Sequence, residues 1–417
     1  MASIPKASHL VLLVGKNPLP NAVAGKLLVK PDGLITLVCS NDSSDVANRL
    51  KLWLEKEVPG VKVVQKKVQE SDPLSISEGI KSCLRKESIG LNYTGGTKMM
   101  SVHAYQAVEH WAEKKRITPV FSYLDARTLE MVFDPSEENI NGKRIYVGQE
   151  VKMKVKDLLD LHGREEERRA EPVLFSTTKK LAETCSKFIG FSSLWNKWVG
   201  EREKTGYLSV PGDEELGQLF NKDKNSKDRD QKINITKFRV AVEEICKILC
   251  EELGREEGKI DLKQPKLIKE FIKWLRGEWL DYYVFFVLKE LQHELKFNDI
   301  VLDLNTKGTK FEVDVAAILG YQLFAFSCKT SSKKDELKLG LFEAYVRARQ
   351  LGGEEARVAL VCCAEEPQVI EKEIETDFDL KGRVRVFGRR DLNELASLLE
   401  DWIRTQSGEG GMSLCNW

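Results

Sequence analysis

The sequence predicts an α/β protein whose N-terminal part is a doubly wound, mostly parallel sheet. Residues 10–14 and 34–38 are continuous apolar runs that end in polar loops, which is typical of strands buried on both faces. Residues 45–58 and 98–114 have the apolar spacing of helices, and residues 88–92 form a short strand between them. Because strands alternate with helices, the loops that follow the strands should gather at the carboxyl edge of the sheet.

Composition excludes several classes of protein. The 417 residues are 42% hydrophobic and 31% charged, which indicates a folded chain of two or three domains rather than a disordered one. The 65 basic and 65 acidic residues balance to +0, so a wholly basic surface is excluded but a local phosphate-binding patch is not. The chain has no apolar run long enough for a membrane helix and no signal-peptide layout, so we expect a cytoplasmic protein without a membrane partner.

Shifts in composition predict the domain organisation. Residues 1–150 form the first α/β unit, and residues 151–235 form a helical linker that includes an exposed, charge-rich segment at 221–232. A second α/β unit covers residues 236–405, with a long helix over 265–295, strands at 299–304, 310–319 and 323–329, and a helix over 335–351. Residues 406–417 form a flexible tail.

A glycine-rich loop in the N-terminal unit is a candidate ligand site. Thr94-Gly95-Gly96-Thr97-Lys98 lies between a predicted strand and a predicted helix, where glycines, hydroxyls, a lysine and helix amides can surround a phosphate. The spacing is not that of a Walker A loop, and a simple turn with a solvated lysine is the alternative. The loops at residues 15–21 and 40–44 should open on the same edge of the sheet.

Residues 91–100 (LNYTGGTKMM) resemble the signature of CARF domains, the CRISPR-associated Rossmann-like sensors. The first loop, with Gly15 and residues 18–21 (PLPN), is similar to the form found in CARF–nuclease effectors. The resemblance implies a homodimer that binds a cyclic oligoadenylate at its two-fold axis. Cyclic tetra-adenylate is the expected activator, although these motifs do not encode the ring size. By position the ligand would contact Asn17, Asn21, Ser40, Asn41, Thr94, Gly95, Gly96, Thr97, Lys98 and Met99.

The last third contains a second group of chemically active residues. Side chains alternate along the strand at residues 311–315, so Glu312 and Asp314 share one face. Lys329, at the end of the next strand, should lie beside Asp314 if the two strands form a hairpin. Acids that hold a divalent cation beside a lysine suit phosphodiester hydrolysis, because the metal activates water and the lysine offsets charge. Solvent-facing surface ion pairs are the alternative.

Asp314, the run Ser327-Cys328-Lys329 and the helix that follows resemble the PD-(D/E)xK nuclease fold. Residues 277–284 (GEWLDYYV) look like the helix that supplies an additional acid in CARF-linked members of this fold. By position this acid is Asp281, and Glu278 is the alternative candidate. Ser327 stands where these nucleases have an acid. Glu312 or the main-chain carbonyl of Cys328 could then complete a metal site built on Asp314 and Asp281.

The two resemblances together imply a nuclease gated by cyclic oligoadenylate in type III CRISPR antiviral defence. Its catalytic residues would be Asp314, Lys329, Glu312, Asp281 and Ser327, with Mg²⁺ or Mn²⁺ as cofactor and DNA or RNA as substrate. Two alternatives remain open at this point. Because Ser327 replaces an acid of the nuclease motif, the chain could be a non-enzymatic regulator. Alternatively, the N-terminal unit could itself degrade the cyclic ligand.

Overall fold

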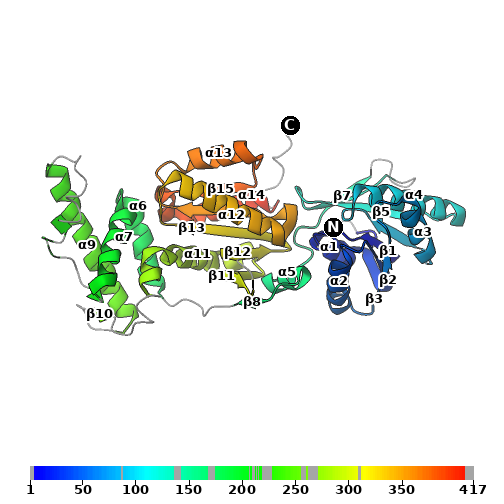
Figure 1. The fold of residues 1–417 in the computed structure, drawn as a ribbon, viewed down its shortest axis with the longest axis horizontal. Coiled ribbons are helices and arrows are strands. Elements are labelled where there is room, and N and C mark those ends of the chain that lie inside the picture. Colours follow the sequence, from blue (N-terminus) through cyan, green and yellow to red (C-terminus); the bar gives the residue numbers. More distant parts are fainter. Residues whose placement is uncertain are drawn as a thin grey trace.

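A computed structural model shows three parts arranged along the long axis of the molecule (Figure 1). The structure describes residues 4–85, 88–135, 142–167, 174–205, 207–208, 212, 214, 216–217, 228–254, 260–261, 271–308 and 311–408. The N-terminal sheet lies at one end, a second sheet lies in the middle, and a group of helices lies at the other end (Figure 1). The described parts of the chain contain no helix that is both long and apolar enough to cross a membrane.

The N-terminal part is the predicted doubly wound unit. Its seven-stranded sheet has the order β3-β2-β1-β4-β5-β6-β7. The strands are β1 (Ala7–Leu13), β2 (Val29–Cys39), β3 (Lys62–Lys67), β4 (Ile89–Asn92), β5 (Val120–Asp125), β6 (Glu130–Phe133) and β7 (Lys143–Tyr146). The helices are α1 (Leu19–Leu28), α2 (Ser44–Glu57), α3 (Pro73–Cys83) and α4 (Lys98–Lys115). Strands β1 to β5 run parallel, whereas β6 and β7 are antiparallel additions at the edge.

Alternate residues of β1 pack against opposite layers of helices. Leu10 and Leu12 join the core under α1 and α2, whereas Val11 and Leu13 join the core under α3 and α4. The strand order reverses between β1 and β4, so the loops after these strands lead to helices on opposite faces of the sheet and lie side by side at its carboxyl edge. The loops after β1, β2 and β4 therefore open on the same edge of the sheet, as the sequence predicts.

The second sheet has six strands in the order β15-β14-β13-β12-β11-β8. They are β8 (Glu166–Glu167), β11 (Asp299–Thr306), β12 (Glu312–Leu319), β13 (Gln322–Lys329), β14 (Arg357–Cys362) and β15 (Val384–Phe387). Helix α11 (Trp279–Leu295) packs on one face and α12 (Lys334–Gly352) on the other. The remaining elements are α13 (Pro367–Phe378), the 3-10 turns η2 (Gly353–Glu355) and η3 (Arg389–Glu394), and α14 (Leu395–Gln406). Because β8 pairs with β11, this sheet includes a strand from residues 151–235, the segment expected to be a helical linker.

The helical part packs against the second sheet rather than standing apart from it. It consists of α6 (Phe175–Lys187), α7 (Phe191–Thr205) and α9 (Asp228–Glu252), with the short antiparallel pair β9 (Tyr207–Leu208), before α9, and β10 (Ile260–Asp261), after it. Trp195 and Trp198 are buried in a core shared with α11, and Trp195 Nε1 donates to Leu275 O at 2.6 Å. Residues 228–232, expected in an exposed loop, belong to α9, while 221–227, 265–270 and 409–417 lie outside the described residues.

Helix α5 (Val155–His162) connects the two sheets. Its Leu161 carbonyl accepts from Arg49 Nε at 2.9 Å, and its Asp157 accepts from Trp53 Nε1 at 3.3 Å, both from α2. On its other side, Val155 N donates to Asp299 Oδ2 at 3.0 Å at the start of β11. Hydrogen bonds to both parts fix α5 between them, so the N-terminal sheet and the second sheet share a continuous core.

Candidate functional site

Strands β12 and β13 form the predicted hairpin and place Asp314 beside Lys329. Asp314 Oδ2 accepts hydrogen bonds from Cys328 N at 2.7 Å and from Ser327 Oγ at 3.3 Å. Lys329 Nζ lies 3.4 Å from the same oxygen. The main-chain donor is fixed by the sheet, so it holds one carboxylate oxygen of Asp314 and leaves the other available for a ligand.

A backbone irregularity faces Asp314 from the neighbouring strand. The pairing of β11 with β12 passes from Leu302–Val315 to Leu304–Val313, and Asp303 between them has a left-handed φ of 53°. A left-handed residue inside a strand costs roughly 1 kcal/mol or more and often re-aims a side chain at a functional site. The sequence shows Asp303 only as an ordinary strand residue, and its conformation could not be predicted from the pattern.

Asp281 reaches the site from the first turn of α11. A π-helical turn, η1 (Trp274–Glu278), precedes this helix and changes its phase, as π-turns at functional sites often do. Ligand atoms of Asp281, Asp314 and Cys328 lie within 4.8 Å of one another and form the group suited to a metal in the described part of the chain. Glu278, the alternate acid, instead forms an ion pair with Lys273.

The charges of this group favour a divalent cation. Burial raises the pKa of Asp281 well above its ordinary value, and the nearby Asp314 carboxylate raises it further. Burial also raises the pKa of the Cys328 thiol, so its sulfur stays protonated and is a poor ligand. Two adjacent carboxylates with little solvent are the hard oxygen donors that Mg²⁺ and Mn²⁺ prefer. The residues present therefore fit the cation that the sequence predicts.

Lys329 remains charged in this environment. Burial lowers its pKa, but Asp314 and Asp281 act in the opposite direction and the net shift is upward. Its side chain is 44% exposed, so the ammonium group can contact a substrate as well as Asp314. Helix α12 supports its stem, because a Cβ at Gly340 would lie 3.3 Å from Lys329 Cε.

A cavity of about 500 Å³ opens over these residues. Its polar and charged lining comprises Lys273, Arg276, Glu278, Asp281, Glu312, Asp314, Lys329, Thr330 and Ser331. Glu312 is exposed and lies outside the close metal group, and Ser327 is buried against Asp314. The sequence interpretation did not single out Arg276 or Thr330, although Thr330 directly follows Lys329 and its hydroxyl donates to Arg276 O at 3.1 Å.

We expect the Asp281→Asn substitution to weaken metal activation much more than Ser327→Ala. Asp281 belongs to the close carboxylate group, whereas Ser327 only adds one hydrogen bond to an oxygen that Cys328 N already holds. Titration of strand cleavage with Mn²⁺ should show a half-activating concentration raised at least ~10-fold for Asp281→Asn and less than ~3-fold for Ser327→Ala. Equal effects would show that Ser327 is itself a ligand.

In the N-terminal part, the first loop (residues 15–21) and the glycine-rich loop (residues 94–98) meet at the carboxyl edge of β1 and β4. A Cβ at Gly15 would lie 3.1 Å from Gly96 N, and a Cβ at Gly95 would overlap Leu13 O. Gly96 has a left-handed φ of 75°, which a residue with a side chain rarely adopts. The glycines therefore permit a close approach of the two loops, which agrees with the predicted convergence.

The remaining loop residues divide into structural and exposed groups. Asn21 Nδ2 donates to Leu13 O at 2.9 Å, Thr94 Oγ1 accepts from Leu124 N at 2.7 Å, and Thr97 Oγ1 accepts from Met100 N at 3.2 Å. Ser40 is buried and bonds to Ser43. The residues with exposed side chains are Asn41, Lys98 and Met99. Lys98 is the first residue of α4, where a lysine and free helix amides together favour an anion.

The first loop differs from its prediction in one respect. The sequence predicts a loop over residues 15–21, but α1 begins at Leu19 directly after Pro18. Asn17 Oδ1 accepts from Leu19 N at 3.1 Å and so caps the helix start. Proline in a first turn is compatible with a helix, because its missing N–H has no partner there.

Comparison with known protein families identifies the C-terminal part of the chain. Residues 268–406 match the family described as Card1-like, endonuclease domain. The chain carries a Card1-like endonuclease domain. This match coincides with α11, the β11–β15 strands and the candidate metal group. It confirms the nuclease-like fold that was expected for the C-terminal part.

Two solved structures are similar over nearly the whole chain. The protein VC1899 from Vibrio cholerae has 15% sequence identity and a TM-score of 0.68, covering 95% of this chain and 98% of that one. Can2 from Sulfobacillus thermosulfidooxidans, solved in complex with cyclic tetra-adenylate, has 15% identity and a TM-score of 0.62, covering 95% of this chain and 99% of that one. Comparison with curated protein sequences gives no match. The similarity establishes the shared fold, a Rossmann-like unit joined to an endonuclease-like unit.

Proposed function

We propose that this chain is a metal-dependent nuclease of CRISPR antiviral defence that a cyclic oligoadenylate activates, with cyclic tetra-adenylate the expected activator. The observation that carries the proposal is the convergence of Asp281, Asp314 and Lys329 in one cavity of an endonuclease-family domain. The fold is shared with a protein solved with cyclic tetra-adenylate, which supports a ligand of this class at the sensor loops. We place the sensor in residues 1–150, the helical linker in 151–235 and the nuclease in 236–405, with α9 (Asp228–Glu252) spanning the second boundary and β8 of the linker completing the nuclease sheet.

Six residues in or beside the cavity have a role in the proposed hydrolysis. Asp281 and Asp314 would hold Mg²⁺ or Mn²⁺, with Glu312 at the rim. When bound, the cation polarises the scissile phosphate and lowers the pKa of a water molecule. Cys328 N–H fixes the orientation of Asp314, and Ser327 adds a second donor. Lys329 offsets the negative charge that develops on the phosphate.

In the sensor, the loops at the carboxyl ends of β1 and β4 would bind the phosphates and bases of the ligand. Lys98 and the amides at the start of α4 supply positive charge, and the glycines let the backbone approach. A cyclic ligand with internal symmetry suits a two-fold axis, so we propose a homodimer in which both copies contact one ring. A nucleic-acid strand, DNA or RNA, would be the substrate of the other domain.

Removal of divalent cations should abolish cleavage. Incubation of the purified protein with cyclic tetra-adenylate and either RNA or DNA should give cleavage with Mn²⁺ or Mg²⁺ and none with EDTA, with activity restored by added Mn²⁺. Ca²⁺ serves as the matched control, since it binds carboxylates but is a weaker Lewis acid. Cleavage that persists in EDTA would contradict the proposed metal role, and loss of the cyclic ligand in an Asp314→Asn protein would indicate ring degradation by the sensor.

A further inference from the structure

A short turn of the nuclease domain reaches the first loop of the sensor. The turn η2 joins α12 to β14, and its first residue, Gly353, has a left-handed φ of 66°. A Cβ at Gly353 would overlap the side-chain amide of Asn17 and lie 2.7 Å from Glu355 Oε2. Asn17 is one of the residues expected to contact the cyclic ligand. Its amide therefore packs directly on the backbone of the nuclease domain.

Asn17 cannot move freely away from this turn. Its Oδ1 accepts from Leu19 N at 3.1 Å, so a rotated side chain would remove the cap of α1. Two residues earlier, Gly15 lies against Gly96 of the glycine-rich loop. The same short segment thus contacts the candidate ligand loop on one side and the nuclease domain on the other.

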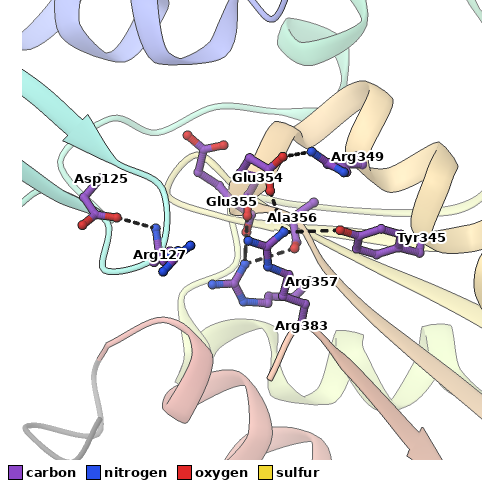
Figure 2. Close-up of polar contacts among 9 residues, drawn as sticks. All are labelled: Asp125, Arg127, Tyr345, Arg349, Glu354, Glu355, Ala356, Arg357 and Arg383. Carbon is purple, nitrogen blue, oxygen red and sulfur yellow. Dashed lines mark hydrogen bonds and ion pairs between the residues drawn. The ribbon is translucent and has the colours of Figure 1, made fainter. Parts of the chain in front are cut away.

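A second acid of the turn, Glu355, is also close enough to the sensor side to feel its charge. Glu355 is only 1% exposed, and Asp125, at the end of β5, lies on the sensor side of the turn with Arg127 (Figure 2). Burial raises the pKa of Glu355 to about 7; its backbone and Arg357 act against this, and Asp125 adds to it. The acids of the two domains are thus close enough to interact.

A network of arginines makes the turn rigid (Figure 2). Arg357 Nη1 donates to the carbonyls of Glu354, Glu355 and Ala356 at 3.2, 3.0 and 3.1 Å. Glu354 forms ion pairs with Arg383 at 2.5 Å and with Arg349 of α12. A turn with this many fixed bonds transmits a displacement instead of absorbing it.

Helix α12 connects this turn to the candidate active site. The helix ends at Gly352, directly before the turn. Nearer its start, Gly340 faces the candidate active site: a Cβ at this position would lie 3.3 Å from Lys329 Cε and 3.8 Å from Ser327 Oγ. A helix moves largely as a rigid rod over this length. Displacement of η2 would therefore shift the support of Lys329.

We propose that the Gly353–Glu355 turn of the nuclease domain forms part of the wall of the sensor's first ligand loop, so that the cyclic ligand acts on α12 through the contact between Asn17 and Gly353. The inference rests on the proposed function, because it requires a ligand in these loops. Coupling between sites is reciprocal in binding free energy. A change in this turn of the nuclease domain must therefore alter ligand affinity in the sensor, which a purely local role in the nuclease fold would not do.

The test is Gly353→Ala against Gly382→Ala. Both glycines have left-handed φ values, 66° and 72°, but a Cβ at Gly382 meets nothing within 4 Å. Calorimetric titration with cyclic tetra-adenylate should give a Kd raised about 5- to 100-fold for Gly353→Ala, with a parallel rise in the concentration for half-maximal cleavage, and unchanged values for Gly382→Ala. Equal Kd values for Gly353→Ala and the wild type would overturn the proposal.

Hydrogen exchange on the wild-type protein tests the same contact without a variant. Cyclic tetra-adenylate should slow exchange both in residues 93–98 and in residues 353–356, where Ala356 N donates to Gly353 O at 3.4 Å. Slowing in the sensor loop alone would contradict the inference and leave the proposed function standing. No slowing in either segment would contradict the proposed function, and this inference with it.

Discussion

Replacing Asp314 with asparagine is expected to lower the rate of Mn²⁺-dependent cleavage by about 1000-fold or more. Asparagine keeps the shape but loses the negative charge beside Asp281, so the cation site and the activation of water are lost together. Such a factor corresponds to about 4 kcal/mol of transition-state stabilisation. Initial cleavage rates at saturating Mn²⁺ and cyclic tetra-adenylate measure the effect.

The matched control is Asp401→Asn, which changes an exposed aspartate of α14 in the same domain. This variant should cut at the wild-type rate. Thermal melting of both variants shows whether the fold is retained. An Asp314→Asn protein that melts as the wild type does and cuts within about threefold of its rate would remove Asp314 from the proposed site.

Replacing Lys98 with alanine should raise the concentration of cyclic tetra-adenylate for half-maximal activation at least about 10-fold. Lys98 is exposed at the first position of α4, where its charge and the helix amides favour the same phosphate. Loss of one charge-assisted hydrogen bond costs about 1.5–3 kcal/mol, which gives the expected factor. Dose–response curves of substrate cleavage measure it.

Lys115→Ala provides the control, since Lys115 is the last residue of the same helix and lies far from its N-terminus. Its dose–response curve should overlay that of the wild type. If Lys98→Ala also overlays the wild-type curve, the ligand does not bind at the start of α4 and the proposed sensor site is wrong.

The fold was predictable where one local signal dominates. The apolar run of β1 and the hairpin that brings Lys329 to Asp314 follow from side-chain alternation and from short connections. Strand β3, with the sequence KVVQKK, is not predicted, because it lies at the edge of the sheet and its lysines hide the pattern. Helix α1 is missed because prolines in its first turn resemble a loop.

The site was predictable in its residue types but not in its detailed geometry. The π-turn before α11 determines that Asp281, rather than Glu278, joins the metal group, and a regular helical spacing does not predict such a turn. The left-handed Asp303 and the contact between Asn17 and Gly353 depend on elements far apart in the sequence. These features arise from tertiary packing, which periodicity does not record.

The most direct test of the account is the ligand dependence of cleavage by the wild-type protein. Cyclic tetra-adenylate is titrated at fixed Mn²⁺ against RNA, single-stranded DNA and plasmid DNA. The account predicts that at least one substrate is cut at least about 10-fold faster with ligand than without, as expected when a ligand shifts a two-state equilibrium. Equal rates with and without ligand on every substrate, or no cleavage of any of them, would contradict it.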